Sequence, residues 1–209
     1  GRRVMLAETT PGGEQEFIDR AVAKQRGLQR VDIRLRVEVP QRRPDDIAVV
    51  ERLAQEIWSQ HFTSIIGASQ VEYMLGKFQS AEAISSQINS GWEYYLAMVD
   101  NEAAGYAGLV PDISNKRLML SKLYVRKSAR GKGVGKSILD FVERKCDSEG
   151  LNTLWLTVNR FNDVPISWYK KCGFVTVDEV KKDIGGGYFM DDYIMEKNIN
   201  IQMQSCQRD

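Results

Sequence analysis

The sequence has little of what disulfide-rich, zinc-binding or membrane proteins depend on. It has three cysteines, Cys146, Cys172 and Cys206, and no C-x-x-C pair, which argues against a disulfide framework and a structural zinc site. No stretch approaches the roughly 20 apolar residues that span a membrane, and no apolar signal-peptide core follows the N-terminal arginines. We therefore expect a cytoplasmic protein with reduced thiols, no metal and no membrane partner.

An excess of charge of one sign is also missing. The chain has 29 Lys and Arg against 28 Asp and Glu, a formal net charge of +1, so charge does not favour a nucleic-acid partner. Apolar residues make up 43% of the 209 residues. That content excludes global disorder, and the length suits one domain with a terminal extension.

The chain divides by pattern into three parts. Residues 1–28 contain a Pro-Gly-Gly break and then helical spacing over 14–24, and we interpret them as a partly helical N-terminal extension. Residues 29–198 carry the domain, and residues 199–209 form a polar tail. The role of the extension does not follow from its sequence.

Hydrophobic periodicity predicts an alternation of strands and helices within the domain. The expected order is one strand, two helices, three strands, a helix, a strand, a short helix and two strands. An α/β (α+β) fold with a mixed sheet covered by helices on both faces follows from this order. The expected strands are 31–39, 94–99, 103–110, 117–125, 151–158, 174–178 and 188–195; the helices are 44–58, 71–88, 134–146 and 165–171, with a loop over 61–70.

The most informative segment joins the strand 117–125 to the helix that begins at Val134. Between them lies a basic, glycine-rich loop, Arg130-Gly131-Lys132-Gly133. A helix start offers unpaired N–H groups and the positive end of the helix dipole, and glycines let the backbone approach a phosphate. The segment therefore predicts a pyrophosphate site.

Two common nucleotide-binding patterns fail in this loop. A P-loop would end in Gly135-Lys136-Ser137, but its first glycine would fall on Arg130. The dinucleotide pattern G-x-G-x-x-G would need glycine where Lys136 stands. A third pattern, [QR]-x-x-G-x-[GA], matches fully from Arg130 to Gly135.

That third pattern resembles the signature loop of GNAT acetyltransferases. About thirty residues later, Asn159 to Phe174 is similar to the family's second landmark, an Asn followed by a short helix ending in Tyr-x-x-x-Gly-Phe. The resemblance covers about residues 30–197 and implies the GNAT fold, a mixed, mostly antiparallel, twisted sheet of about seven strands. The loop at His61-Phe62 and the ending from Met190 look most similar to bacterial polyamine-acetyltransferase-like members.

The resemblance implies acetyl-CoA as co-substrate and assigns it residues. The backbone of the loop would hold the pyrophosphate, and the strand before it would contact the pantetheine arm, with a main-chain N–H near Val125 as donor to the thioester oxygen. Asn162 matches a position that contacts the cofactor arm, although it also suits a helix cap. The implied cofactor-binding residues are Leu123, Tyr124, Val125, Arg130, Gly131, Lys132, Gly133, Val134, Gly135, Lys136 and Asn162.

Tyr169 matches the family's general acid, because a phenol can give its proton to a departing thiolate. A buried aromatic anchor for the short helix is the other reading. The general base stays open. His61, the only histidine, lies where the family borders the acceptor pocket, and Asp191, Asp192 and Glu93 are alternatives. If residues 191 and 192 lie in a strand, at most one of the two aspartates faces the pocket.

The predicted function is transfer of an acetyl group from acetyl-CoA to a primary amine by direct attack in a ternary complex. The acceptor would be a small amine, a polyamine or a peptide amine. A non-catalytic acyl-CoA-binding or sensor module is the alternative, and the intact Tyr169 argues against it. Family resemblance also allows a homodimer. The sequence names neither the acceptor nor the length of the acyl group.

Overall fold

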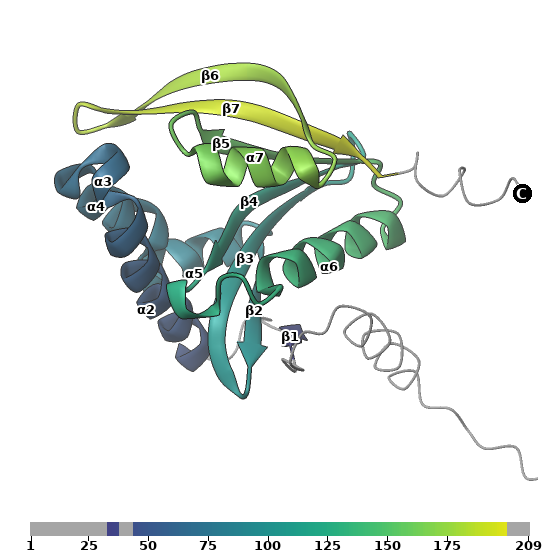
Figure 1. Cartoon of the computed structure of the whole chain (residues 1–209), viewed down its shortest axis with the longest axis horizontal. Helices are drawn as coiled ribbons and strands as arrows, with labels where there is room; N and C mark the ends of the chain where they lie inside the picture. The colour runs from purple at the N-terminus through teal and green to yellow at the C-terminus, as the bar shows by residue number, and fades with distance from the viewer. Residues whose placement is uncertain (1–32, 38–43, 200–209) are drawn as a thin grey trace, which may run out of the picture. The chain divides into compact units, whose positions relative to one another are not determined.

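The computed structural model describes residues 33–37 and 44–199, all within one compact unit, Ile33–Asp209. The expected N-terminal helix over 14–24 and the tail from residue 200 lie outside the described residues. The described strands form a single seven-stranded sheet in the order β1-β2-β3-β4-β5-β7-β6 (Figure 1). They are β1 (Ile33–Val37), β2 (Glu93–Val99), β3 (Glu102–Asp112), β4 (Arg117–Val125), β5 (Thr153–Asn159), β6 (Val175–Gly185) and β7 (Tyr188–Asn198).

The sheet is mixed. Every neighbouring pair is antiparallel except β4 and β5, which run parallel. Helices cover both faces, with the α2–α5 group on one side and α6 and α7 on the other (Figure 1). The expected fold class is confirmed. The helices are α2 (Pro44–His61), α3 (Thr63–Ile66), α4 (Ala68–Met74), the π-helical η1 (Leu75–Gln79), α5 (Ala81–Asn89), the 3₁₀ turn η2 (Lys127–Ala129), α6 (Val134–Ser148) and α7 (Asp163–Lys171).

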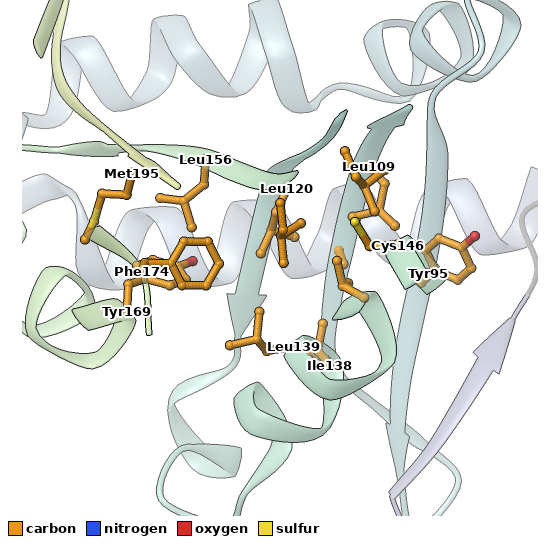
Figure 2. Close-up of a cluster of buried hydrophobic side chains, with 14 of the residues drawn as sticks. Tyr95, Leu109, Leu120, Ile138, Leu139, Cys146, Leu156, Tyr169, Phe174 and Met195 are labelled. Atoms are coloured by element: carbon orange, nitrogen blue, oxygen red, sulfur yellow. The ribbon is translucent and has the colours of Figure 1, made fainter. Parts of the chain in front are cut away.

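Each face of the sheet has its own hydrophobic core. The α6 face buries Ile138 and Leu139 of α6 together with Phe174 and Met195 (Figure 2). The α2 face buries Ile57 and Trp58 against aromatic residues of β2 and β3. The two cores fix both helical layers to the sheet, so the loops at the sheet's end are held in position by packing.

Two helical predictions were wrong in detail. The segment 61–70 is helical over most of its length, because α2 continues to His61 and α3 and α4 follow on either side of Gly67. The expected single helix over 71–88 is instead broken into α4, η1 and α5. The break is at Ser80, which has extended backbone and accepts a hydrogen bond from the N–H of Ala83, so it caps α5.

β2 and β3 are joined by a tight turn at Asp100 and Asn101, and β6 is longer than predicted. Asp100 and Asn101 have φ values of 50° and 64°, the left-handed conformation that tight hairpins require. β6 continues past residue 178 to Gly185, so Lys181 and Lys182 lie in a strand. The Gly185–Gly187 segment does form the hairpin tip.

Candidate active site

The two parallel strands at the middle of the sheet separate soon after they meet. β4 pairs with β5 only at three positions, where 117–119 face 153–155. Beyond Met119 and Trp155, the two strands have no ladder between them. Backbone N–H and C=O groups of β4 from Leu120 to Val125 therefore face an opening in the sheet, into which an extended ligand can insert as an additional strand.

A β-bulge in β4 determines which side chains face the two cores near this opening. Leu120 pairs with Leu109 and Lys122 with Gly108, so Ser121 is the extra residue. Leu120 lies in the α6-side core, and after the bulge Leu123 and Val125 pack there as well. Lys122 and Tyr124 consequently point to the α2–α5 side. There, Lys122 donates hydrogen bonds to Phe78 and Gln87. Tyr124 packs against the α2-side core.

The glycine-rich loop follows at the end of β4. Gly131 and Gly133 have φ values of 75° and 85°, a conformation that strains other residues. Gly133 is the N-cap of α6, where it offers no side-chain hydrogen bond, and the first turn has no acidic residue. The first N–H groups of a 15-residue helix thus face outward without a capping side chain.

The charged side chains of this loop are accessible. Arg130 and Lys132 are exposed, and the Arg130 Nε donates to the carbonyl oxygen of Val125 at 3.0 Å, which ties the loop to the end of β4. Lys136 is about half-exposed and forms an ion pair with Asp140 one turn later. The structure therefore brings together the predicted cofactor residues 123–125 and 130–136 at one end of the opening.

Asn162 follows the end of β5 and lies against His61, the last residue of α2. Asn162 is the N-cap residue of α7 by position, but its side chain makes no capping hydrogen bond. The Oδ1 atom lies instead 3.1 Å from Nε2 of His61, and the Asn162 residue is only 7% exposed. The capping interpretation of the Asn162 side chain is therefore wrong. Two residues 101 positions apart, both selected from the sequence, are in contact.

Tyr169 lies on α7 inside the α6-side core (Figure 2). The ring centroid is 5.0 Å from that of Trp168 and 5.4 Å from that of Phe174. Burial, followed by the nearby Cys172, raises the pKa of Tyr169 well above its ordinary value. A tyrosine hydroxyl is protonated at neutral pH even at its ordinary pKa, and this is the state that a proton donor needs.

Tyr124 is a buried tyrosine whose pKa is affected by several nearby groups. Burial first, then the nearby Tyr169, Asp192 and Tyr94, raises the pKa of Tyr124. The Tyr124 ring packs against α2, with centroids 5.6 Å from Trp58 and 6.1 Å from Phe62. Tyr124 is thus within electrostatic range of both Tyr169 and Asp192.

Asp192 is the one buried carboxylate among the three alternatives for a base. The pKa of Asp192 is raised to about 6. Burial is the main cause, the charge of Asp191 adds to it, and a hydrogen bond from Thr157 partly opposes it. The residue is 7% exposed. Such a carboxyl group changes protonation state just below neutral pH, as a proton acceptor for an amine would.

The other two acidic alternatives already have basic partners. Asp191 lies 2.7 Å from Nε of Arg160, and Glu93 lies 2.9 Å from Nζ of Lys145 and also accepts from Tyr95. Adjacent Asp191 and Asp192 therefore have different surroundings, in agreement with the prediction that at most one of them faces the pocket.

The tip of the β6–β7 hairpin lies beside the α2–α5 group and is anchored to α4 and η1 (Figure 1). The Tyr73 hydroxyl donates to the carbonyl oxygen of Ile184 at 2.6 Å, and Lys77 donates to the same oxygen. Gln70 donates to the carbonyl oxygen of Phe189 at 2.9 Å. Three side chains on one face of consecutive helical turns thus hold the β6–β7 hairpin in place.

Lys122 is a residue that sequence reasoning missed. It is 4% exposed, and its Nζ donates to the carbonyl oxygen of Phe78 at 2.7 Å, to Oε1 of Gln87 at 2.9 Å and to the Tyr94 hydroxyl. Burial lowers the pKa of Lys122 to about 7. The sequence shows only a lysine within a largely apolar strand. That pattern does not distinguish a buried amine from an exposed one.

Within residues 33–37 and 44–199, no group of three or more His, Cys, Asp or Glu side chains is arranged to hold a metal ion. In the same part of the chain, no helix is long and apolar enough to cross a bilayer.

Known proteins resemble this chain in sequence and in fold. The model of the acetyltransferase (GNAT) family matches residues 51–174. Spermidine N(1)-acetyltransferase of Thermoplasma acidophilum is 27% identical over 166 residues, 77% of this chain and 96% of that protein. An uncharacterized N-acetyltransferase of Lactobacillus delbrueckii subsp. lactis is 26% identical over 150 residues, 68% of this chain and 87% of that protein.

A solved structure shares the fold. The crystal structure of the PaiA N-acetyltransferase of Thermoplasma acidophilum, in complex with coenzyme A, superposes with a TM-score of 0.64 at 24% identity. The match covers 81% of this chain and 99% of that one.

Proposed function

This chain belongs to the acetyltransferase (GNAT) family and is an acetyl-CoA-dependent acetyltransferase; we propose that it moves the acetyl group onto a primary amine of a polyamine. The observation that carries the proposal is the opening between β4 and β5. The start of α6 lies at one side of it and the buried Asp192 on the other.

We propose that the start of α6 holds the cofactor's pyrophosphate. The outward-facing N–H groups of the first turn and the accessible side chains of Arg130 and Lys132 suit two phosphates. The pantetheine arm would then lie along β4 from Leu123 to Val125, where β5 no longer pairs. A main-chain N–H near Val125 would donate to the thioester oxygen and stabilise the oxyanion.

Chemistry in the ternary complex would proceed by direct attack. The amine nitrogen bonds to the thioester carbon, the carbon–sulfur bond breaks, and the thiolate takes the proton of the Tyr169 hydroxyl. A tyrosine hydroxyl is protonated at neutral pH, so Tyr169 holds a proton that it can donate once the thiolate forms.

The attacking amine must first lose a proton, and we propose Asp192 as the acceptor, directly or through water. The carboxyl group has a pKa of about 6, so it is mostly ionised at neutral pH. It lies within electrostatic range of Tyr124. His61 is assigned to the acceptor side through its bond with Asn162 and not as the base.

A polyamine is the acceptor class that these charges favour. Asp192 is a buried carboxylate beside the opening, and its negative charge favours an acceptor that carries ammonium groups. The 27% identity with a spermidine N(1)-acetyltransferase supports the same class.

The test is release of CoA thiol from acetyl-CoA in the presence of spermidine, spermine, putrescine, a monoamine and a peptide with a free N-terminus. The proposal predicts kcat/KM for the polyamines at least about tenfold above the monoamine, since a second ionic contact contributes about 1.5 kcal/mol or more. A preference for the peptide would contradict the polyamine assignment. Binding of acetyl-CoA without turnover on any amine would instead favour the sensor alternative.

A further inference from the structure

β6 is an unusually exposed strand at the edge of the sheet. Among the described strands it pairs only with β7. All of its 11 residues are exposed except Val180 and Ile184. An edge of this length presents unpaired N–H and C=O groups that can pair with another strand.

The middle of this edge is regular. Register shifts occur between Thr176 and Asp178 and between Asp183 and Gly185. The six residues between them, 178–183, pair one-to-one with residues of β7. This segment therefore offers an unbulged stretch for pairing, bounded on both sides by irregularities that would limit its extent.

The charges along this segment are arranged symmetrically about Val180. Asp178 and Glu179 precede it, and Lys181 and Lys182 follow it. Two identical antiparallel strands related by a two-fold axis pair residues whose numbers have a constant sum. With Val180 opposite Val180, Glu179 faces Lys181 and Asp178 faces Lys182, each twice.

We propose that β6 pairs with β6 of a second copy of this chain, antiparallel and centred on Val180, to form a homodimer with a continuous sheet. All four charged cross-strand pairs are then of opposite sign, which stabilises a β ladder. Centring on Glu179 or on Lys181 would place like charges directly opposite each other. The charge order thus selects both the occupant and the register.

The side chains of the proposed pairs also make contacts within their own chain. Glu179 is paired with Arg160, and Lys181 lies over the Phe189 ring at 5.3 Å, so these two side chains are already held in position. The Asp178 carboxylate accepts from the N–H of Glu179 at 2.8 Å and retains a second oxygen for a lysine. The inference does not depend on the proposed acceptor or mechanism.

Sedimentation equilibrium of the full chain in reducing buffer tests the dimer. The proposal predicts a species of twice the chain mass whose dissociation constant increases with salt. Lys182→Glu puts carboxylates opposite Asp178 in both pairs and should weaken association about tenfold or more. Exchanging the charges in Asp178→Lys/Lys182→Glu should restore it to within about threefold of the original.

Lys116→Glu is the matched control, because it makes the same charge change on an exposed residue at the β3–β4 turn. It should leave the dissociation constant unchanged. Thermal unfolding of each variant would verify that it is folded. A chain that stays monomeric up to about 100 µM, or a dimer that Lys182→Glu does not weaken, would overturn the proposal. Failure of the folded exchange variant to recover would overturn the register.

Discussion

The Nε2 atom of His61 lies 3.1 Å from Oδ1 of Asn162, which joins the end of α2 to the start of α7. These helices lie on opposite faces of the sheet, so the contact bridges the end of the opening between β4 and β5. It links the proposed acceptor side to a residue proposed to touch the cofactor arm.

This contact predicts coupling between the two residues. Asn162→Ala should raise the KM for acetyl-CoA about two- to tenfold, the value of one hydrogen bond. His61→Ala should have a smaller effect in the same direction, because it would only release Asn162. In the double variant the two losses should be less than additive, as steady-state kinetics on all four proteins would reveal. Fully additive effects would show that the contact does not position Asn162.

Tyr169→Phe should separate chemistry from binding. The ring remains in its packing with Phe174, and only the acidic hydroxyl is lost. We expect kcat to fall about 10²- to 10⁴-fold, with little change in the affinity for acetyl-CoA. Tyr95→Phe is the control, since Tyr95 belongs to the same core but donates to Glu93 on β2. Unchanged kcat in Tyr169→Phe would remove the acid assignment.

The Asp192→Asn substitution should have opposite effects on activity and on stability. With a pKa of about 6 in the folded protein, kcat/KM should fall as the pH drops below about 6, and Asp192→Asn should lose most activity. An acidic limb of the pH profile that is unchanged in Asp192→Asn would exclude Asp192 as the proton acceptor.

The stability effect has a defined sign. Because the folded-state pKa of Asp192 is raised above its ordinary value of 3.8, the group favours folding at low pH, and this contribution is lost as the pH rises through 3.8 to about 6. Asp192→Asn mimics the protonated form, so it should increase the free energy of unfolding at pH 7.5, by at most about 3 kcal/mol. The gain should vanish near pH 3.5, as urea unfolding at both pH values would measure.

Lys122 makes a different prediction about pH. Burial lowers its pKa to about 7, so between about pH 7 and 10 the unfolded chain binds a proton that the folded chain does not. Through this group, the free energy of unfolding should rise with pH across that window. Lys122→Met should abolish that rise and also release the carbonyl oxygen of Phe78 in η1. Parallel pH profiles for the two proteins would contradict the assigned pKa.

Local patterns predicted the parts of this fold that are stabilised locally. The loop from Arg130 to Gly135 could be assigned from six residues, because the glycine conformations and the helix start lie within one stretch of chain. The turn at Asp100-Asn101 was predictable for the same reason.

Features that depend on distant contacts could not be predicted. The π-helical turn η1 is held by Lys122, whose Nζ reaches the Phe78 carbonyl from a strand 44 positions away. The length of β6 was missed because its exposed residues show no alternation of apolar and polar side chains. The bond between His61 and Asn162 spans 101 positions, so the sequence could select both residues without showing that they touch.

The most direct measurement is thermal unfolding of the chain and of Gly133→Ala with acetyl-CoA or Mg-ATP. Gly150→Ala is the control, because both glycines have positive φ, 85° and 69°, and open space around them, but only Gly133 caps α6. Each variant should lose about 1 kcal/mol of stability. The account predicts that acetyl-CoA stabilises the original protein and Gly150→Ala by about 2.7 kcal/mol at a hundredfold excess over Kd, and Gly133→Ala less, with no shift from Mg-ATP. A shift with Mg-ATP alone, or equal shifts in both variants, would contradict the placement of the cofactor at the start of α6.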